Sequence, residues 1–173
     1  MATRCAIGPL NPVTEMRLQK IISGGQTGVD RAALDAALAH DVPVGGWCPR
    51  GRRAEDGGVP ERYPLREAPS EAYEQRTAWN VRDSDGTLII TDGTLEGGTA
   101  LTMREAQRQG RAVLHVRTPD PVPVEMIRAW GADHDVRTLN VAGPRASEVD
   151  GIYDRARLIL DAFLQEVTAN DPS

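Results

Sequence analysis

The chain has 173 residues, with 20 lysine and arginine side chains against 25 aspartate and glutamate side chains, so its formal net charge is −5. This length fits one domain with its own hydrophobic core. The negative charge gives no general attraction to nucleic acids or acidic membrane surfaces, and we expect neither a signal peptide nor a membrane-spanning segment. The two cysteines, Cys5 and Cys48, fit neither a disulfide framework nor a metal-binding spacing. We therefore expect a soluble cytoplasmic protein.

A glycine-rich turn separates an apolar run at Ile21 and Ile22 from a helical pattern that starts near residues 27–29 and reaches His40. Glycines let a ligand approach the backbone, and the unpaired amides at the start of a helix favour an anion. The turn fits neither the P-loop nor the dinucleotide fingerprint, and glycines kept only for tight packing are the alternative. Asp30 could instead stabilise the dipole of the first helical turn. The candidate binding residues here are Gly24, Gly25, Gln26, Thr27, Gly28 and Asp30.

A second strand is expected within residues 42–47, where Pro43 favours a short strand or an edge position. Residues 48–66 show neither helical nor strand periodicity, and a structureless stretch of this length in a compact domain is usually functional or disordered. We interpret it as a binding loop. Arg50 and Arg52 are candidate ligands for phosphate or carboxylate, although a solvated charged loop is the alternative.

Helices and strands alternate in the rest of the chain. We predict helices at 70–82, with Ser70 as its cap, at 100–109, at 124–130 and from 144–147 to 167, and strands at 87–91, 112–116 and 138–142. A second glycine-rich turn, residues 92–99, follows the strand at 87–91. Residues 1–19 are expected to form an N-terminal arm, 20–167 a single domain and 168–173 a tail.

This alternation, with apolar strands, predicts an α/β fold in which a parallel sheet of about five strands is covered by helices on both faces. Ligands of such sheets bind beyond the carboxyl ends of the strands. Three glycine-bearing turns should meet there, so the second and third turns and the stretch before the third strand add candidates. These are Asp85, Gly97, Gly98, Thr99, Asn140 and Arg145. No spacing of histidine, cysteine and acidic residues indicates a metal site, and Cys48 either lines the pocket or is a small buried residue.

Five stretches of the chain together resemble the family described as putative molybdenum carriers, a branch of the Rossmann-like superfamily that also holds the Lonely-guy and DprA-type proteins. They are Ile21–Asp35, Gly46–Gly57, Asn80–Ile90, Gly97–Thr99 and Leu139–Ser147. The resemblance implies a Rossmann-like three-layer sandwich, a phosphorylated nucleotide-like or pterin ligand such as molybdenum cofactor, and a homo-oligomer. Lonely-guy enzymes carry P-G-G-x-G-T-x-x-E, whereas here Thr102 stands where that glutamate would be.

Three functions remain open. The first, which we favour, is a carrier or binding protein for such a phosphorylated small molecule. The second is a hydrolase that cleaves the N-glycosidic bond of a nucleotide derivative, with a pocket carboxylate positioning water. The third is a ligand-sensing interaction module.

Overall fold

The computed structural model describes residues 14–118 and 121–170, and its centre is a five-stranded sheet in the order β2-β1-β9-β7-β8. All four strand pairs are parallel, as the alternation of helices and strands predicted. The strands are β1 (Lys20–Ile22), β2 (Val44–Gly45), β7 (Gly86–Thr91), β8 (Ala112–Arg117) and β9 (Thr138–Ala142). β2 is short and lies at the edge of the sheet, in agreement with the effect expected of Pro43.

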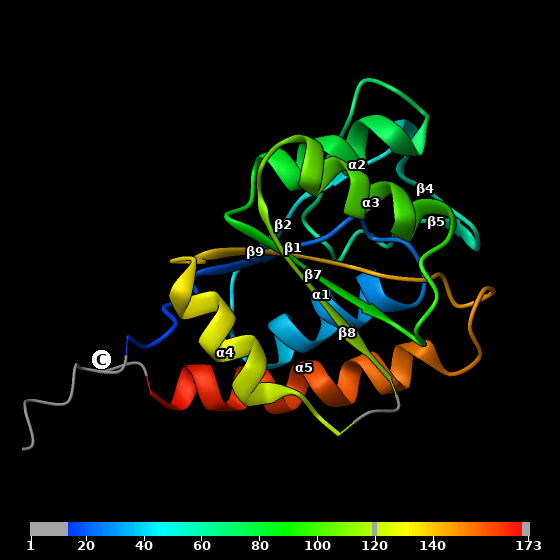
Figure 1. Cartoon of the computed structure of the whole chain (residues 1–173). Coiled ribbons are helices and arrows are strands. Elements are labelled where there is room, and N and C mark those ends of the chain that lie inside the picture. Colours follow the sequence, from blue (N-terminus) through cyan, green and yellow to red (C-terminus); the bar gives the residue numbers. More distant parts are fainter. Residues whose placement is uncertain (1–13, 119–120, 171–173) are drawn as a thin grey trace, which may run out of the picture.

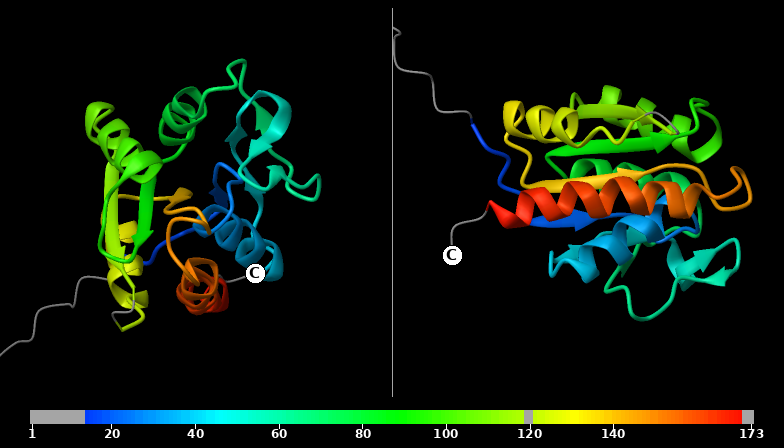
Figure 2. Two further views of the ribbon diagram at one scale, coloured as in Figure 1. Left: turned by 90° about the vertical axis from the view of Figure 1, so that its right-hand side faces the viewer. Right: turned by 90° about the horizontal axis from the view of Figure 1, so that it is seen from below.

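Helices cover both faces of this sheet, which confirms the three-layer Rossmann-like architecture (Figures 1 and 2). One face carries α1 (Val29–Ala39), α4 (Val124–Asp133) and α5 (Ile152–Ala169), and the other carries α2 (Tyr73–Arg82) and α3 (Gly97–Arg108). β7 is buried along its whole length because it lies between these layers. Its apolar side chains Leu88 and Ile90 join those of α1 and α5 in the main hydrophobic core.

The last strand in the chain, β9, lies between β1 and β7. From β1 the chain moves outward to β2, and from β7 it moves outward to β8 in the other direction. The strand order therefore reverses around β9, which is the position where parallel sheets of this kind bind ligands. The turns after β1 and β9 and the loop after β7 all leave the same edge of the sheet.

Residues 47–67 form an ordered substructure rather than the structureless loop that we predicted. β3 (Trp47–Cys48) pairs with β6 (Arg66–Glu67), a one-turn 3-10 helix spans Arg50–Arg52, and β4 (Arg53–Ala54) forms a hairpin with β5 (Gly57–Gly58). A second small core explains this order. It consists of Leu34, Cys48, Val59, Tyr63 and Leu65, and it fixes the segment to α1. These apolar residues are too irregularly spaced to show a period.

Several element ends differ from the predictions. α5 begins at Ile152, not at 144–147, because turns and a bend occupy residues 146–151, and it continues to Ala169. Ser70 is not the cap of α2. The N-cap is Ala72, and the Ser70 hydroxyl accepts a hydrogen bond from the Ala72 amide in the preceding turn. Most of the expected arm and the end of the expected tail lie outside the described residues. None of the helices within the described ranges has both the length and the apolar composition to cross a membrane.

Candidate functional site

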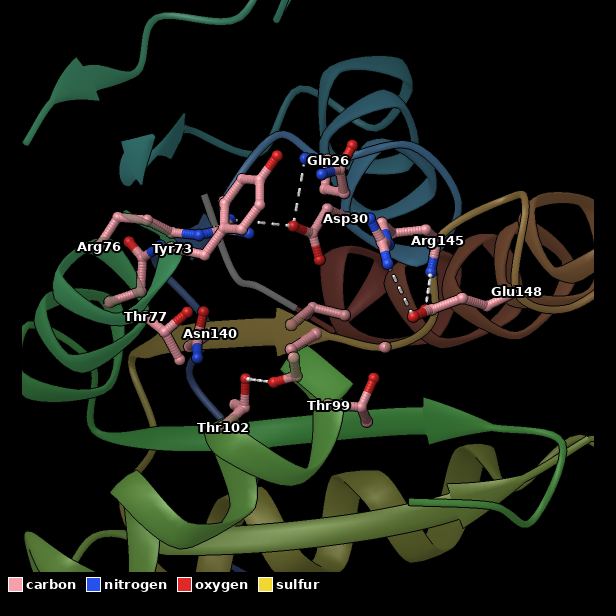
Figure 3. A pocket seen from close by; sticks show the side chains of 16 residues that line it. Gln26, Asp30, Tyr73, Arg76, Thr77, Thr99, Thr102, Asn140, Arg145 and Glu148 are labelled. Carbon is pink, nitrogen blue, oxygen red and sulfur yellow. Dashed lines mark hydrogen bonds and ion pairs between the residues drawn. The ribbon is translucent and has the colours of Figure 1, made fainter. Parts of the chain in front are cut away.

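A pocket opens at the carboxyl edge of the sheet, between the two helices of one face and the turns that follow β1 and β9 (Figure 3). Its empty space is about 720 Å³, including the part open to solvent. Residues from four regions line it: Gly24, Gln26 and Asp30 after β1; Tyr73, Arg76, Thr77 and Asn80 on α2; Gly98, Thr99 and Thr102 on α3; and Asn140, Val141, Ala142, Gly143, Arg145 and Glu148 on β9 and beyond. The pocket therefore lies where the strand order reverses.

A buried pair of charges, Asp30 on α1 and Arg76 on α2, forms one wall. Arg76 Nη1 lies 3.4 Å from Asp30 Oδ2, and the two side chains are only 11% and 8% exposed. The guanidinium occupies the space that a side chain at position 24 would need, which explains the glycine there. Arg76 Nε is buried and has no hydrogen-bond partner in the described part of the chain. Burial raises the pKa of Asp30, and Arg76 and the Gln26 amide, which donates to Oδ2 over 3.2 Å, counter this only in part.

The opposite wall is the N-terminus of α3. Within residues 14–118 and 121–170, no side chain caps this helix. Apart from its chain neighbours and the backbone of its own helix, a Cβ atom at Gly98 would have no atom of these residues within 4 Å. Thr99, the next residue, is almost fully buried and lines the pocket. The first amides of a helix carry partial positive charge. The Thr99 and Ala100 amides donate to the Glu96 carbonyl at 3.1 Å. The Gly97 and Gly98 amides are therefore those with which this end of α3 can bind an anionic group.

The N-terminus of α1, where we predicted an anion, is instead filled by the protein itself. Gln26 Oε1 accepts the Thr27 amide at 3.0 Å, and the Pro144 carbonyl accepts the Val29 amide at 3.3 Å. A side chain at Gly28 would collide with the backbone of residues 144–146. The first glycine turn is therefore packed against the loop after β9, which agrees with the alternative that its glycines serve tight packing.

Glu55 joins three regions beside the pocket. It accepts hydrogen bonds from the Thr27 hydroxyl and from the Ser147 hydroxyl (2.5 Å), and its own amide donates to Gln26 Oε1 (2.9 Å). Desolvation raises the pKa of Glu55, but the hydrogen bonds from Ser147 and Thr27 outweigh it and hold this pKa below its usual value. The β4–β5 hairpin is therefore attached to the turns after β1 and β9.

The neighbouring Asp56 adds a second attachment. It makes a two-point ion pair with Arg31 on α1, at 2.5 and 2.8 Å. The hydrogen bonds from Arg31 lower the pKa of Asp56. Because both acidic residues belong to the hairpin, residues 53–58 lie against the rim of the pocket rather than free in solvent.

The pocket brings together part of the predicted set and leaves the rest outside. Those that line it are Gly24, Gln26, Asp30, Gly98, Thr99, Asn140 and Arg145. Arg145 is paired with Glu148 through its amide (2.9 Å) and its guanidinium (3.2 Å). The Asn140 amide group donates to the Thr87 hydroxyl at 3.2 Å. Gly97 starts α3 next to the pocket with a φ of +50°.

The other predicted residues have structural contacts. Gly25 packs on Val59 and Leu65. Thr27 bridges Glu55 and the Ala146 amide. Arg50 is exposed and pairs with Glu71.

Two of the predicted residues are placed quite differently from our expectation. Arg52 points into the protein and donates to the carbonyls of residues 59, 60, 63 and 65. Asp85 precedes β7, so it lies at the amino edge of the sheet, where its carboxylate accepts the amides of Arg137 and Thr138 (3.0 and 2.8 Å). Placing Asp85 beside the glycine turns was wrong, because a residue before a parallel strand lies at the opposite edge.

Apart from Asn80, which precedes the third strand and was a candidate for this edge, one wall of the pocket was not predicted from the sequence. Tyr73, Arg76, Thr77 and Asn80 share one face of α2, at the i, i+3, i+4 and i+7 spacing of a helix. The sequence feature that could have predicted this wall is a row of polar residues at helical spacing on a helix that is expected to pack against a sheet. Thr102, one turn into α3, and Glu148, three residues after Arg145, were missed as well.

Cys48 does not line the pocket. It is fully buried in the second core, and desolvation raises the pKa of its thiol. In the part of the chain that the structure describes, no three histidine, cysteine, aspartate or glutamate side chains gather in a way that would hold a metal ion. Cys5 lies outside that part.

Comparison with known proteins gives two findings. Residues 21–164 match the family described as the circularly permutated YpsA SLOG family. The crystal structure of a protein named as a putative molybdenum carrier from Syntrophus aciditrophicus SB is 47% identical in sequence, with a TM-score of 0.84. The match covers 87% of this chain and 97% of that one. No curated protein is significantly similar.

Proposed function

Because the chain belongs to the circularly permutated YpsA SLOG family, we propose that it binds a phosphorylated small molecule with a nucleotide-like or pterin ring, as a carrier or binding protein. The main support for this proposal is that one pocket has two chemically different walls, the N-terminus of α3 and the Asp30–Arg76 ion pair. The uncapped N-terminus of α3 at Gly98 suits a phosphate. The Asp30–Arg76 wall suits the polar edge of a ring.

Molybdenum cofactor, a pterin with a phosphate tail and sulfur atoms that hold the metal, is one ligand of this kind. The residues present fit its organic part: Gly98 and Thr99 would hold the phosphate, and Asp30 and Arg76 the pterin. The name of the protein that is 47% identical supports the same ligand class. When bound, the cofactor would supply a molybdenum centre for transfer to another protein, while this chain would hold and shield the pterin.

Native mass spectrometry of gently purified protein, followed by denaturation and analysis of the released molecule and metal, tests this proposal. We expect one phosphorylated pterin or nucleotide per chain, and molybdenum with it if the ligand is the cofactor. Protein that releases no phosphorylated molecule, and takes up none from a mixture of nucleotides and pterins, would contradict the proposal.

One observation favours the hydrolase as a second candidate. Asp30 is a buried carboxyl group whose pKa is raised by desolvation inside the pocket, which is how general acids are made in enzymes. Incubation with nucleoside monophosphates and chromatography of the products separates the two functions. A hydrolase releases free base, and Asp30→Asn abolishes the release, whereas a carrier returns its ligand unchanged.

A cytoplasmic location and self-association complete the proposal. Light scattering after size-exclusion chromatography, with and without the released ligand, measures the oligomeric state directly. We expect more than one chain per particle. An assembly that forms or separates only when ligand is added would favour the sensing function over the carrier.

A further inference from the structure

The wall made by Asp30 and Arg76 has hydrogen-bonding groups without partners. Asp30 Oδ2 accepts the Gln26 amide and contacts Arg76. Both of these contacts end on Oδ2, and the Ser23 hydroxyl, which lies close enough to lower the pKa of Asp30, donates its proton to the Val141 carbonyl at 2.6 Å. The other carboxylate oxygen of Asp30 is directed toward the open space of the pocket (Figure 3). With the residues that the structure describes, Arg76 makes one long hydrogen bond of 3.4 Å, and its Nε has no partner among them. Buried charges normally form short charge-assisted hydrogen bonds, so this wall is incomplete without a ligand.

The order of acceptor and donor groups along this wall, Asp30 and then Arg76, determines which heterocyclic ring can form hydrogen bonds with both. A carboxylate accepts two neighbouring N–H groups, and a guanidinium donates to an oxygen. We propose that Asp30 and Arg76 bind the edge of a 2-amino-4-oxopyrimidine ring, the edge that guanine and pterins share. Asp30 accepts from the amino group and the ring N–H, and Arg76 donates to the adjacent oxo oxygen. This inference rests on the proposed function and specifies its ligand class.

Other common rings do not match this order. Xanthine has an oxo oxygen in place of the amino group, so that oxygen would face the Asp30 carboxylate. Adenine has a ring nitrogen with a lone pair in place of the ring N–H. In both cases the buried carboxylate would meet an acceptor, which is costly where water cannot intervene.

Tyr73 supplies a flat surface next to this edge. It lines the same pocket, and its ring centroid lies 5.4 Å from the Arg76 guanidinium. A heterocycle paired with Asp30 can stack on an aromatic ring in this position. Stacking does not depend on the identity of the base, so Tyr73 contributes affinity and Asp30 contributes selectivity.

Calorimetric titration of the wild-type full chain with four nucleoside monophosphates tests the inference. We expect guanosine monophosphate to bind roughly tenfold to a hundredfold more tightly than xanthosine or adenosine monophosphate, because one base edge is discriminated. The affinity for inosine monophosphate, which lacks only the amino group, should lie between these two levels. A separate titration with 6-hydroxymethylpterin distinguishes the two sources of the edge, guanine and pterin.

Asp30→Asn provides the matched variant. Its side-chain N–H groups can donate to the xanthine oxygen, so we expect the preference to change from guanosine to xanthosine monophosphate. Asp133→Asn makes the same chemical change at an exposed position on α4 and should leave the preference unchanged. Tyr73→Leu should lower the affinity for all four nucleotides by a similar factor.

The outcomes separate this inference from the proposed function. Equal binding of all four nucleotides and the pterin would overturn the inference and leave the proposed function intact. An unchanged guanine preference in folded Asp30→Asn protein would also overturn the inference. No binding of any of these compounds would overturn both.

Discussion

The two glycine turns of this protein look alike in sequence and differ in structure. After β1, Gly25 and Gly28 have positive φ angles of 77° and 81°, and side chains there would collide with Val59, Leu65 or the backbone of residues 144–146. At the start of α3, apart from the chain neighbours of Gly98 and the backbone of its own helix, no atom of the described residues lies within 4 Å of the position that the Gly98 Cβ would take. The first turn is filled by protein and the second is open to a ligand.

The difference follows from what the rest of the chain places against each turn. The hairpin at residues 53–58, the second core and the loop after β9 all lie against the first turn, where Gln26 accepts the Thr27 and Glu55 amides and Glu55 accepts the Thr27 hydroxyl. Among the described residues, no other segment comes within 4 Å of the position that a Cβ atom of Gly98 would take. A glycine-rich turn before a helix therefore indicates close packing or ligand binding equally, and the neighbouring elements determine which.

The largest effect is expected from Gly25→Val, which tests whether the first turn is structural. A β-branched residue at positive φ is strained, and its Cβ would lie 2.7 Å from Leu65 Cδ1. We expect the free energy of unfolding to fall by about 3 kcal/mol or more, measured by urea denaturation. Gly98→Ala is the control and should change it by no more than about 1 kcal/mol. Wild-type stability in Gly25→Val protein would show that the first turn is not packed.

Two neighbouring arginines, both predicted to bind an anion, also differ in whether they hold the protein structure together. Arg52 donates hydrogen bonds to the backbone carbonyls of residues 59, 60, 63 and 65, whereas Arg50 makes an exposed ion pair with Glu71. We expect Arg52→Met to lower the free energy of unfolding by about 2–4 kcal/mol and Arg50→Met by less than about 0.5 kcal/mol. Equal losses in the two variants would contradict the structural role of Arg52.

The attachment of the hairpin should weaken in acid. The folded-state pKa values of Glu55 and Asp56 lie below the ordinary values of these side chains, 4.5 and 3.8. Their stabilising effect is therefore complete above the unfolded pKa values and disappears as the pH falls through the folded ones. We expect amide hydrogen exchange in residues 53–58 to accelerate below about pH 4 relative to the sheet, and Glu55→Gln to reproduce part of this at neutral pH. Exchange that stays slow in Glu55→Gln protein would contradict the attachment.

The sequence predicted the fold better than it predicted the site. Strand β9 was predicted with its correct bounds, Thr138–Ala142. The strand predicted at 87–91 came within one residue of β7, because its centre, Leu88–Ile90, is the continuous apolar run typical of a buried parallel strand. Residues 47–67 were misjudged because their order comes from contacts of Tyr63 and Leu65 with α1, which no local periodicity records.

Site residues were predictable where a turn carries them and not where a helix does. Gly98 and Arg145 follow strands, so their edge of the sheet was known in advance, and Asn140 lies within the strand before Arg145. Arg76 lies on α2, and its place in the pocket depends on how that helix packs against the sheet. Its pairing with Asp30 is a tertiary contact that only the structure shows.

The central claim is that the ligand lies against the open second turn, and Gly98→Val tests it most directly. Native mass spectrometry would compare ligand occupancy in wild-type, Gly98→Ala and Gly98→Val protein after equal exposure to guanosine monophosphate and 6-hydroxymethylpterin, with circular dichroism confirming the fold. The branched side chain at the pocket wall should abolish occupancy, and the smaller Ala should reduce it less, while both variants stay folded. Gly98→Val protein that holds as much ligand as the wild type, or wild-type protein that holds none, would contradict the claim.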